Sequence, residues 1–205
     1  SNGKALLTNN IFNAAIDNAT DLQIQPGSVV TTGGGNQWAG EGYYVENLSA
    51  NALNISGDNF DQADQYRRTD RIYDALDNAT SGLVRFNGNN LYVSAPGTGL
   101  SNETSLLAMS AAALTGDRIN KESGIYATGL DATSKGVMIA LGSSPGCVTL
   151  AGDMVLDIND DLEIELNGTV ACTGYDRFIV NGTVTLGNAN LAATLGYVPN
   201  NGDTY

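Results

Sequence analysis

The sequence predicts a mainly β protein in which short strands stack in layers as a solenoid, with two short helices. Apolar and polar residues alternate over short runs, and these runs end at Asn-Gly, Gly-Asn or Pro turns. Asn is frequent, and stacked layers use Asn at inward corners because its amide bonds to backbone or to the Asn one layer up. For the C-terminal module, a β-sandwich or a meander is the alternative.

The run from Leu156 to Leu166 carries the clearest alternation. Its even-numbered positions are mostly apolar, which predicts one buried sheet face, and its odd-numbered positions are acidic or amide. Ca²⁺ prefers several convergent oxygens, so a weak metal site is one interpretation of the polar row, although a Gly-punctuated calcium loop is missing. An acidic solvated face is the other. The candidate ligands are Asp157, Asn159, Asp161 and Glu163.

Two helices are expected, one in each half of the chain. Residues 70–80 place Ile72, Ala75, Leu76 and Ala79 at helical spacing, and residues 102–115 form a wider apolar stripe that ends at Gly116. The second helix should cap a stack of strands. The Gly- and Pro-containing residues 94–99 lie between the two helices, so we predict domains at 1–100 and 101–205.

Two turn motifs predict local pairing. Residues 87–90 read Asn-Gly-Asn-Asn between two apolar runs, which is typical of a β-hairpin. The tetrapeptide Asn-Gly-Thr-Val occurs at residues 167–170 and 181–184, and we interpret its copies as equivalent turns in consecutive layers. A spacing of 14 residues is short for a solenoid coil, so a local hairpin or meander stays open.

Charge and hydropathy exclude some partners. Nine Lys and Arg against 22 Asp and Glu give a net charge of -13, which repels nucleic acid. The chain has no run of about 20 apolar residues, so no membrane insertion is expected. It also lacks a signal peptide and an initiator Met, so we expect a mature piece or a segment of something longer.

The two cysteines, Cys147 and Cys172, leave two possibilities. If they pair, the closed loop of about 25 residues stabilises the fold by roughly 3–4 kcal/mol on the chain-entropy model. Two buried free thiols are equally compatible with the sequence.

Few residues suggest chemistry. The absence of His removes the commonest general base and most transition-metal sites. An acid- and Arg-rich segment could form a polysaccharide-cleaving site, but a solvated connection is favoured, so no catalytic residue is assigned and no enzyme is expected. Its candidates are Asp58, Asp61, Asp64, Asp70 and Asp74 with Arg67, Arg68 and Arg71. Trp38, Tyr43 and Tyr44 could stack on a sugar or form an interface, although a core role is the default.

Several segments resemble known modules of very large secreted or surface proteins of bacteria. The runs Ser144-Pro145-Gly146, residues 174–187 and residues 195–203 are similar to autotransporter-associated β-strand repeats. Residues 106–126 resemble the entry helix and first coil of pectin-lyase-like right-handed parallel β-helices. Where that pattern has an apolar strand residue after Ile119-Asn120, this chain has Lys121, so we expect an irregular first coil.

The resemblance implies an extracellular, cell-surface location and a structural or adhesive role without a cofactor, Ca²⁺ excepted. We expect the module to associate with itself head to tail into a filament, because uncapped solenoid ends expose unpaired backbone groups and apolar layers. A carbohydrate-binding module for surface glycans and a polysaccharide lyase or glycosidase are the alternatives.

Overall fold

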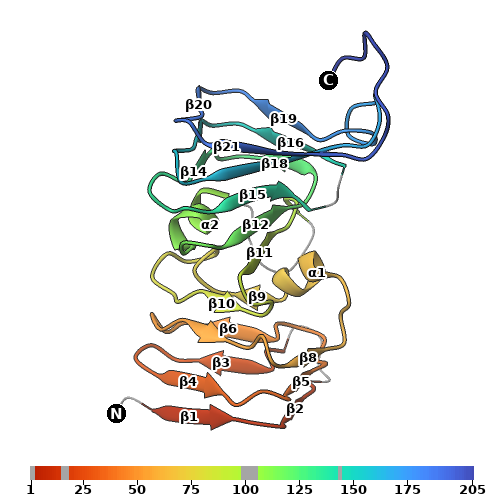
Figure 1. The fold of residues 1–205 in the computed structure, drawn as a ribbon. Coiled ribbons are helices and arrows are strands. Elements are labelled where there is room, and N and C mark those ends of the chain that lie inside the picture. The colour runs from red at the N-terminus through yellow and green to blue at the C-terminus, as the bar shows by residue number, and fades with distance from the viewer. Residues whose placement is uncertain (1–2, 15–18, 98–105, 143–144) are drawn as a thin grey trace. The chain divides into compact units, whose positions relative to one another are not determined.

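A computed structural model describes residues 3–14, 19–97, 106–142 and 145–205. Within these residues the chain divides into two compact units. Unit 1 contains the described residues up to Asn89 together with Gly97, and unit 2 contains Asn90–Pro96 and the described residues from Leu106 onward. Each unit is a solenoid of parallel strands, so the predicted fold class is confirmed (Figure 1). The predicted boundary between residues 100 and 101 lies outside the described residues.

Unit 1 is built from short strands that return to the same three sides of a coil. The ladders β2-β5-β8 and β3-β6-β9 each hold one strand from each of three turns, and the pairs β1-β4 and β7-β10 form the remaining side. The strands are β1 (Lys4–Leu7), β2 (Ile11–Phe12), β3 (Leu22–Ile24), β4 (Val29–Thr32), β5 (Gln37–Trp38), β6 (Val45–Asn47), β7 (Leu53–Asn54), β8 (Asn59–Phe60), β9 (Ile72–Tyr73) and β10 (Val84–Arg85).

An aromatic column fills one side of unit 1. The parallel register places Phe12, Trp38 and Phe60 at equivalent positions of β2, β5 and β8. The rings of Phe12 and Trp38 stack with their centroids 4.3 Å apart. Trp38 is fully buried, and its indole Nε1 donates to Asp58 at 3.1 Å, which satisfies the polar end of the ring.

A polar column runs beside the aromatic one. Asn10 Nδ2 donates to Asn36 Oδ1 at 3.0 Å, and Asn36 Nδ2 donates to Asp58 Oδ1 at 2.9 Å. These residues occupy the same corner in three consecutive turns, so one hydrogen-bonded line links the turns. The expected inward Asn at solenoid corners is therefore present in unit 1.

Unit 2 repeats the three-sided plan with longer ladders. Its ladders are β11-β12-β15-β18-β21, β13-β16-β19 and β14-β17-β20, all parallel. The strands are β11 (Asn90–Val93), β12 (Arg118–Lys121), β13 (Gly124–Tyr126), β14 (Leu130–Asp131), β15 (Met138–Leu141), β16 (Cys147–Leu150), β17 (Met154–Val155), β18 (Asp161–Leu166), β19 (Arg177–Val180), β20 (Val184–Thr185) and β21 (Asn190–Leu195).

An apolar row forms the core of unit 2. The register aligns one residue from each strand of the five-stranded ladder, and the members from β12 and β15 are fully buried. Because parallel in-register strands place like side chains on top of one another, each turn buries the row of the turn beside it. The row consists of Leu91, Ile119, Ile139, Leu162 and Leu191.

The helix α2 (Leu106–Ala112) confirms that a helix lies within the predicted range 102–115, although residues 102–105 lie outside the described part. It contacts β14 and β11 in unit 2, and Met109 is buried on it. Lys135 Nζ donates to the Ala111 carbonyl at 2.7 Å. This contact is favourable because a cation stabilises the partial negative charge at a helix C-terminus. The helix thus closes part of the unit 2 core, as expected of a cap.

The helix predicted at residues 70–80 is wrong. A shorter helix, α1 (Gln65–Thr69), precedes this segment, and Ile72 lies in β9, where it pairs with Val45. The buried Asp74 prevents a helix here because its carboxylate accepts from the backbone N–H groups of Leu76 and Val84. Burial raises the pKa of Asp74 to about 7.

The predicted hairpin and the predicted equivalent turns are also wrong. The strands that flank residues 87–90 pair in parallel with other strands, β10 with β7 and β11 with β12. The first Asn-Gly-Thr-Val copy lies between β18 and β19, and the second leads into β20. The copies are two different corners of one turn, because the strands of a three-sided coil follow one another at spacings shorter than the full turn.

Candidate functional site

The corner between β18 and β19 in unit 2 carries the most unusual group of residues. In the preceding turn, β15 and β16 are joined by residues 142–146, whereas residues 167–176 join β18 to β19. We call residues 167–176 the corner insertion. Asp176 is its one buried residue, so little apolar burial holds it in place.

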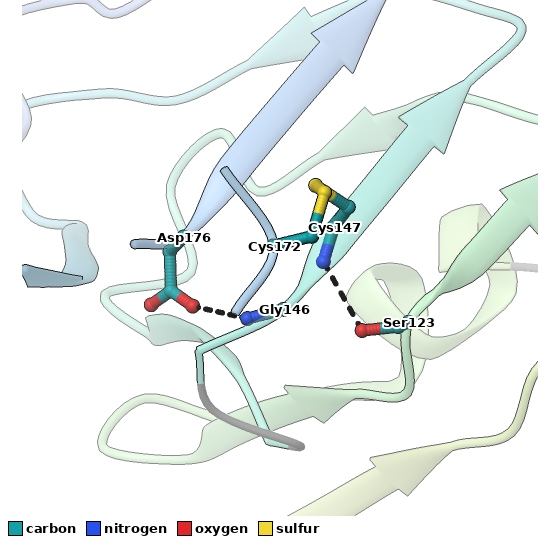
Figure 2. Close-up of a disulfide and its surroundings, with 5 residues drawn as sticks. All are labelled: Ser123, Gly146, Cys147, Cys172 and Asp176. Carbon is teal, nitrogen blue, oxygen red and sulfur yellow. Dashed lines mark hydrogen bonds between the residues drawn. A yellow bond between two sulfur atoms is a disulfide. The ribbon is translucent and has the colours of Figure 1, made fainter. Parts of the chain in front are cut away.

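A disulfide fixes the corner insertion to the turn beside it. Cys172 of the insertion bonds to Cys147 at the start of β16, with their Cα atoms 4.9 Å apart (Figure 2). Of the two possibilities left by the sequence, pairing is therefore correct. The separation of 25 residues corresponds to roughly 3–4 kcal/mol on the chain-entropy model.

Asp176 makes the second attachment of the corner insertion. Its Oδ1 accepts from Gly146 N at 2.7 Å (Figure 2). Its Oδ2 accepts from Glu165 N at 2.8 Å. Arg177 N donates to Gly146 O at 2.9 Å. The disulfide and these hydrogen bonds reach the neighbouring turn at adjacent residues, Gly146 and Cys147, so the attachment is concentrated at one point.

Lys121 is buried beneath this corner. The register of β11, β12 and β15 aligns it with Val93 and Leu141, so it occupies an inward position in an apolar row. Its side chain is 0% exposed, and Nζ has no hydrogen-bond partner among the described residues. Nζ lies 4.0 Å from the centroid of the Phe178 ring. Burial lowers the pKa of Lys121 to about 7, and the charge of Asp176 opposes that shift.

The sequence marked Lys121 as unusual, but our prediction for this position was wrong. We expected an irregular first coil where Lys121 replaces an apolar residue, but β12 is regular and pairs on both sides. Strict alternation from Ile119 places Lys121 on the same inward face. An inward lysine in a strand is the pattern that could have identified this position.

A groove lies beside the corner insertion. It has a volume of about 460 Å³ and opens to solvent. Tyr205 and Tyr175 form an edge-to-face pair with centroids 5.7 Å apart. Arg177 is exposed, so its guanidinium faces solvent at the edge of the groove. The lining residues are Ile164, Leu166, Tyr175, Asp176, Arg177, Phe178 and Tyr205.

The last strands of unit 2 form a second candidate surface. Leu191 continues the row of the buried Ile139 and the half-buried Leu162 yet is 62% exposed, and Val184 continues the row of Leu130 and Met154 yet is 51% exposed. In the described chain, β19, β20 and β21 each pair on one edge only. We call the exposed side chains Val184, Leu186, Leu191 and Leu195 the apolar end.

The aromatic residues predicted to stack on a sugar lie elsewhere. Trp38 and Tyr44 are fully buried in unit 1, and Tyr43 is half-buried, edge-on to Tyr73 with centroids 6.3 Å apart. A buried ring has no free face for a ligand, so the core role holds for Trp38 and Tyr44. The groove in unit 2 offers the more accessible rings.

The Ca²⁺ candidates are each engaged by other groups. Asp157 accepts from the backbone N–H groups of Asn159 and Ser134, Asp161 accepts from Asn190 at 2.7 Å, and Glu163 forms an ion pair with Arg118 at 2.5 Å. In the part of the chain that the structure describes, no group of three or more His, Cys, Asp or Glu side chains is placed to hold a metal ion. Ca²⁺ binding here stays a prediction.

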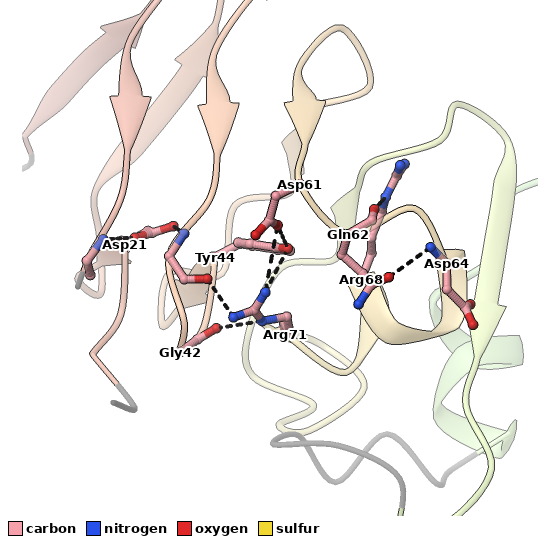
Figure 3. Close-up of polar contacts among 10 residues, drawn as sticks. Asp21, Gly42, Tyr44, Asp61, Gln62, Asp64, Arg68 and Arg71 are labelled. Atoms are coloured by element: carbon pink, nitrogen blue, oxygen red, sulfur yellow. Dashed lines mark hydrogen bonds and ion pairs between the residues drawn. The ribbon is translucent and has the colours of Figure 1, made fainter. Parts of the chain in front are cut away.

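Arg71 organises the acidic segment of unit 1. It donates from Nη1 to the Tyr44 hydroxyl at 2.9 Å and from Nε to Gly42 O at 3.1 Å, and it lies 3.7 Å from Asp61 (Figure 3). The Tyr44 hydroxyl in turn donates to Asp61. Burial, followed by this bond to Asp61, raises the pKa of Tyr44 to about 12. We call Arg71, Tyr44 and Asp61 the Arg71 clamp.

The other acids of this segment also have structural partners. Asp64 caps α1 by accepting from Tyr66 N at 2.9 Å, and Asp70 pairs with Arg67 at 2.5 Å. Arg68 lies over the Phe60 ring, 4.8 Å from its centroid. The polar groups of this segment thus hold the chain together, and because Asp70 and Asp74 are buried the segment is not the solvated connection that the sequence favoured.

Comparisons with known proteins add no family. No family model, no curated protein and no solved structure matches the chain. Among the described residues, no helix combines the length and the apolar character that crossing a membrane requires.

Proposed function

We propose that the chain is a structural module of an extracellular bacterial protein and that it associates with a second copy end to end. The observation that carries this proposal is the apolar end of unit 2. Rows that are buried in the inner turns continue into β20 and β21 and are left open to water there. Exposed apolar rows and open strand edges favour the addition of another turn of the same kind.

A second copy fits this surface because unit 1 offers three open strands of the same type. Among the described residues, β1, β2 and β3 each pair on one edge only, with β4, β5 and β6. The three strands β19, β20 and β21 of one copy could therefore continue into β1, β2 and β3 of the next as parallel ladders. Such head-to-tail contacts build a filament when the rotation between successive copies does not close into a ring.

The disulfide supports the extracellular location. Disulfides persist in oxidising compartments and are rare where glutathione and thioredoxin keep thiols reduced. Both cysteines of the chain are paired, and the described residues contain no free cysteine. A count of free thiols in protein isolated without reductant tests this point, and two free thiols would argue against it.

Size measurement tests the association. We expect the mass found by light scattering to rise with concentration and Leu191→Asp to abolish the rise, because a carboxylate in the apolar end would be buried without a partner. Ile125→Asp is the matched control, since Ile125 is 72% exposed on the outward side of β13. A wild-type chain that stays monomeric at high concentration would refute the proposal.

The groove beside the corner insertion favours glycan binding as a second candidate function. Aromatic rings next to a guanidinium and a carboxylate are typical of sites that stack on a sugar ring and bond to its polar groups. On a glycan array, Tyr175→Ala and Arg177→Gln should each remove binding that Ile125→Ala retains. Equal binding by all three variants would exclude the groove.

A further inference from the structure

We propose that Lys121 is a cryptic amine, covered by Phe178 of the strand that follows the corner insertion, and that the Cys147–Cys172 disulfide is a latch whose reduction by a thiol exposes it. This inference concerns a modification site and does not require end-to-end association. It rests on the position of Lys121, on the residues that cover it and on how those residues are attached.

The burial of the Lys121 amine destabilises the closed conformation of this corner. An amine in an apolar row without a hydrogen-bond partner loses its hydration and gains only the Phe178 ring, 4.0 Å from Nζ, in return. Asp176 is near enough to act on the charge, but both of its carboxylate oxygens accept from backbone N–H groups. Hydration of Lys121 therefore favours opening whenever the cover is free to move.

The cover over Lys121 comes from the segment that the disulfide holds. Phe178 lies in β19, directly after the corner insertion, and Asp176 is the last residue of the insertion. The insertion reaches the neighbouring turn through Cys147 and through Gly146. Loss of the disulfide leaves the hydrogen bonds of Asp176 and Arg177 and the parallel ladder between β16 and the edge strand β19 to hold the cover.

Cys172 can be reached by a reductant. It is exposed, whereas the Lys121 amine is buried. Two equivalents of a small thiol reduce the bond: the two cysteines each gain a hydrogen and become thiols, and the reductant is oxidised to its disulfide. The released amine can then be acylated by an activated ester, with an amide formed and the alcohol part of the ester released.

Amine acylation measures the exposure directly. The sequence contains three lysines, Lys4, Lys121 and Lys135, so peptide mass spectrometry assigns each label without overlap. With an N-hydroxysuccinimide ester of acetate, we expect Lys4 to react before and after reduction. Lys121 should react slowly in the oxidised chain and on the order of 100-fold faster after dithiothreitol. The double variant Cys147→Ser, Cys172→Ser should label at the fast rate without reductant.

Hydrogen exchange separates a latch from general unfolding. If the disulfide is a latch, reduction raises exchange more in residues 161–180 than in β12 and β15, where the loss of protection reflects only the lower unfolding free energy of unit 2. Uniform loss of protection from β12 to β21 would show that the bond only stabilises unit 2 and would overturn the proposal. Unchanged slow acylation of Lys121 in the reduced, folded chain would overturn it as well.

Discussion

The two units place a long segment at a corner of their third turn and hold it by different means. In unit 1, residues 61–71 join β8 to β9 and include α1, whereas β5 and β6 are joined by residues 39–44. In unit 2, the corner insertion joins β18 to β19. The solenoid accepts such segments because a corner can lengthen without disturbing the strand register on either side.

The means of attachment differ in their chemistry. The segment of unit 1 is held by the Arg71 clamp, in which a guanidinium donates hydrogen bonds to Tyr44 and a backbone carbonyl and forms an ion pair with Asp61. The insertion of unit 2 is held by a covalent bond with two hydrogen bonds to Asp176. The comparison teaches that one fold can make its corners sensitive to different conditions: unit 1 to the loss of a charge, and unit 2 to reductant.

Loss of the disulfide should have the largest effect. The double variant Cys147→Ser, Cys172→Ser is expected to lose roughly 3–4 kcal/mol of unfolding free energy in unit 2 because the unfolded chain regains the entropy of the open loop. Hydrogen exchange resolved by peptide measures this for each unit. Dithiothreitol should lower the stability of the wild type and leave the double variant unchanged. A lower unfolding free energy of unit 1 in the double variant would show that the two corners are not independent.

Loss of the Arg71 clamp should have the next effect. Arg71→Ala leaves Asp61 and a buried tyrosine hydroxyl without their cation, which should cost unit 1 about 2–3 kcal/mol. Urea unfolding followed by exchange in β6 and β9 measures the loss. Arg177→Ala is the control, because that side chain is exposed, and its change should stay within about 0.5 kcal/mol.

Removal of the buried charge should stabilise unit 2. Lys121→Met keeps the volume of the side chain and removes the desolvated amine, so we expect a gain of roughly 1–3 kcal/mol. The folded pKa of about 7 lies below the ordinary 10.5, so the wild-type chain carries its full penalty below pH 7. The penalty fades as pH rises toward 10.5, because the unfolded chain then loses its proton too.

The pH dependence of this gain is its test. The advantage of Lys121→Met should therefore shrink between pH 7 and pH 10 in thermal unfolding. Lys135→Met is the control, since Lys135 bonds to the Ala111 carbonyl at the surface and its change should be small and destabilising. A gain that is the same at every pH would mean that packing, and not the amine, causes it.

Chelation should have the smallest effect. The oxygens of Asp157, Asp161 and Glu163 already accept hydrogen bonds or an ion pair. Treatment with a chelator is expected to leave the melting temperature of unit 2 unchanged, and added Ca²⁺ should not raise it. A higher melting temperature with Ca²⁺ would show that a bound cation stabilises unit 2, as the sequence analysis allowed.

Sequence patterns predicted the fold class well and the local elements less well. Alternation and turn residues indicate parallel layers, because each strand buries one face on the turn beside it. The spacing of Ile72 and Leu76 suggested a helix, yet Ile72 pairs in β9 and Asp74 bonds to backbone N–H groups. An apolar pattern over so few residues is compatible with a helix or a strand. The long-range hydrogen bond from Val84 N to Asp74 favours the strand and turn that the structure has here.

The candidate site was only partly predictable. Both cysteines were identified, but pairing depends on the distance between their Cα atoms, which spacing alone does not give. Lys121 was noted as a departure from an apolar pattern, but its burial depends on Phe178, a residue of a later turn. The groove also joins residues from the corner and from Tyr205, and no local pattern brings these together.

The line of Asn10, Asn36 and Asp58 in unit 1 has a direction. Each side-chain amide donates a hydrogen bond to the residue at the same corner of the next turn. The carboxylate of Asp58 only accepts, so the line ends there. Growth past Asp58 in the same direction would need a donor at position 58, which a carboxylate lacks. Asp58 is thus the terminal acceptor of the line, whereas an Asn at this position would have an N–H left to extend the line into a further turn.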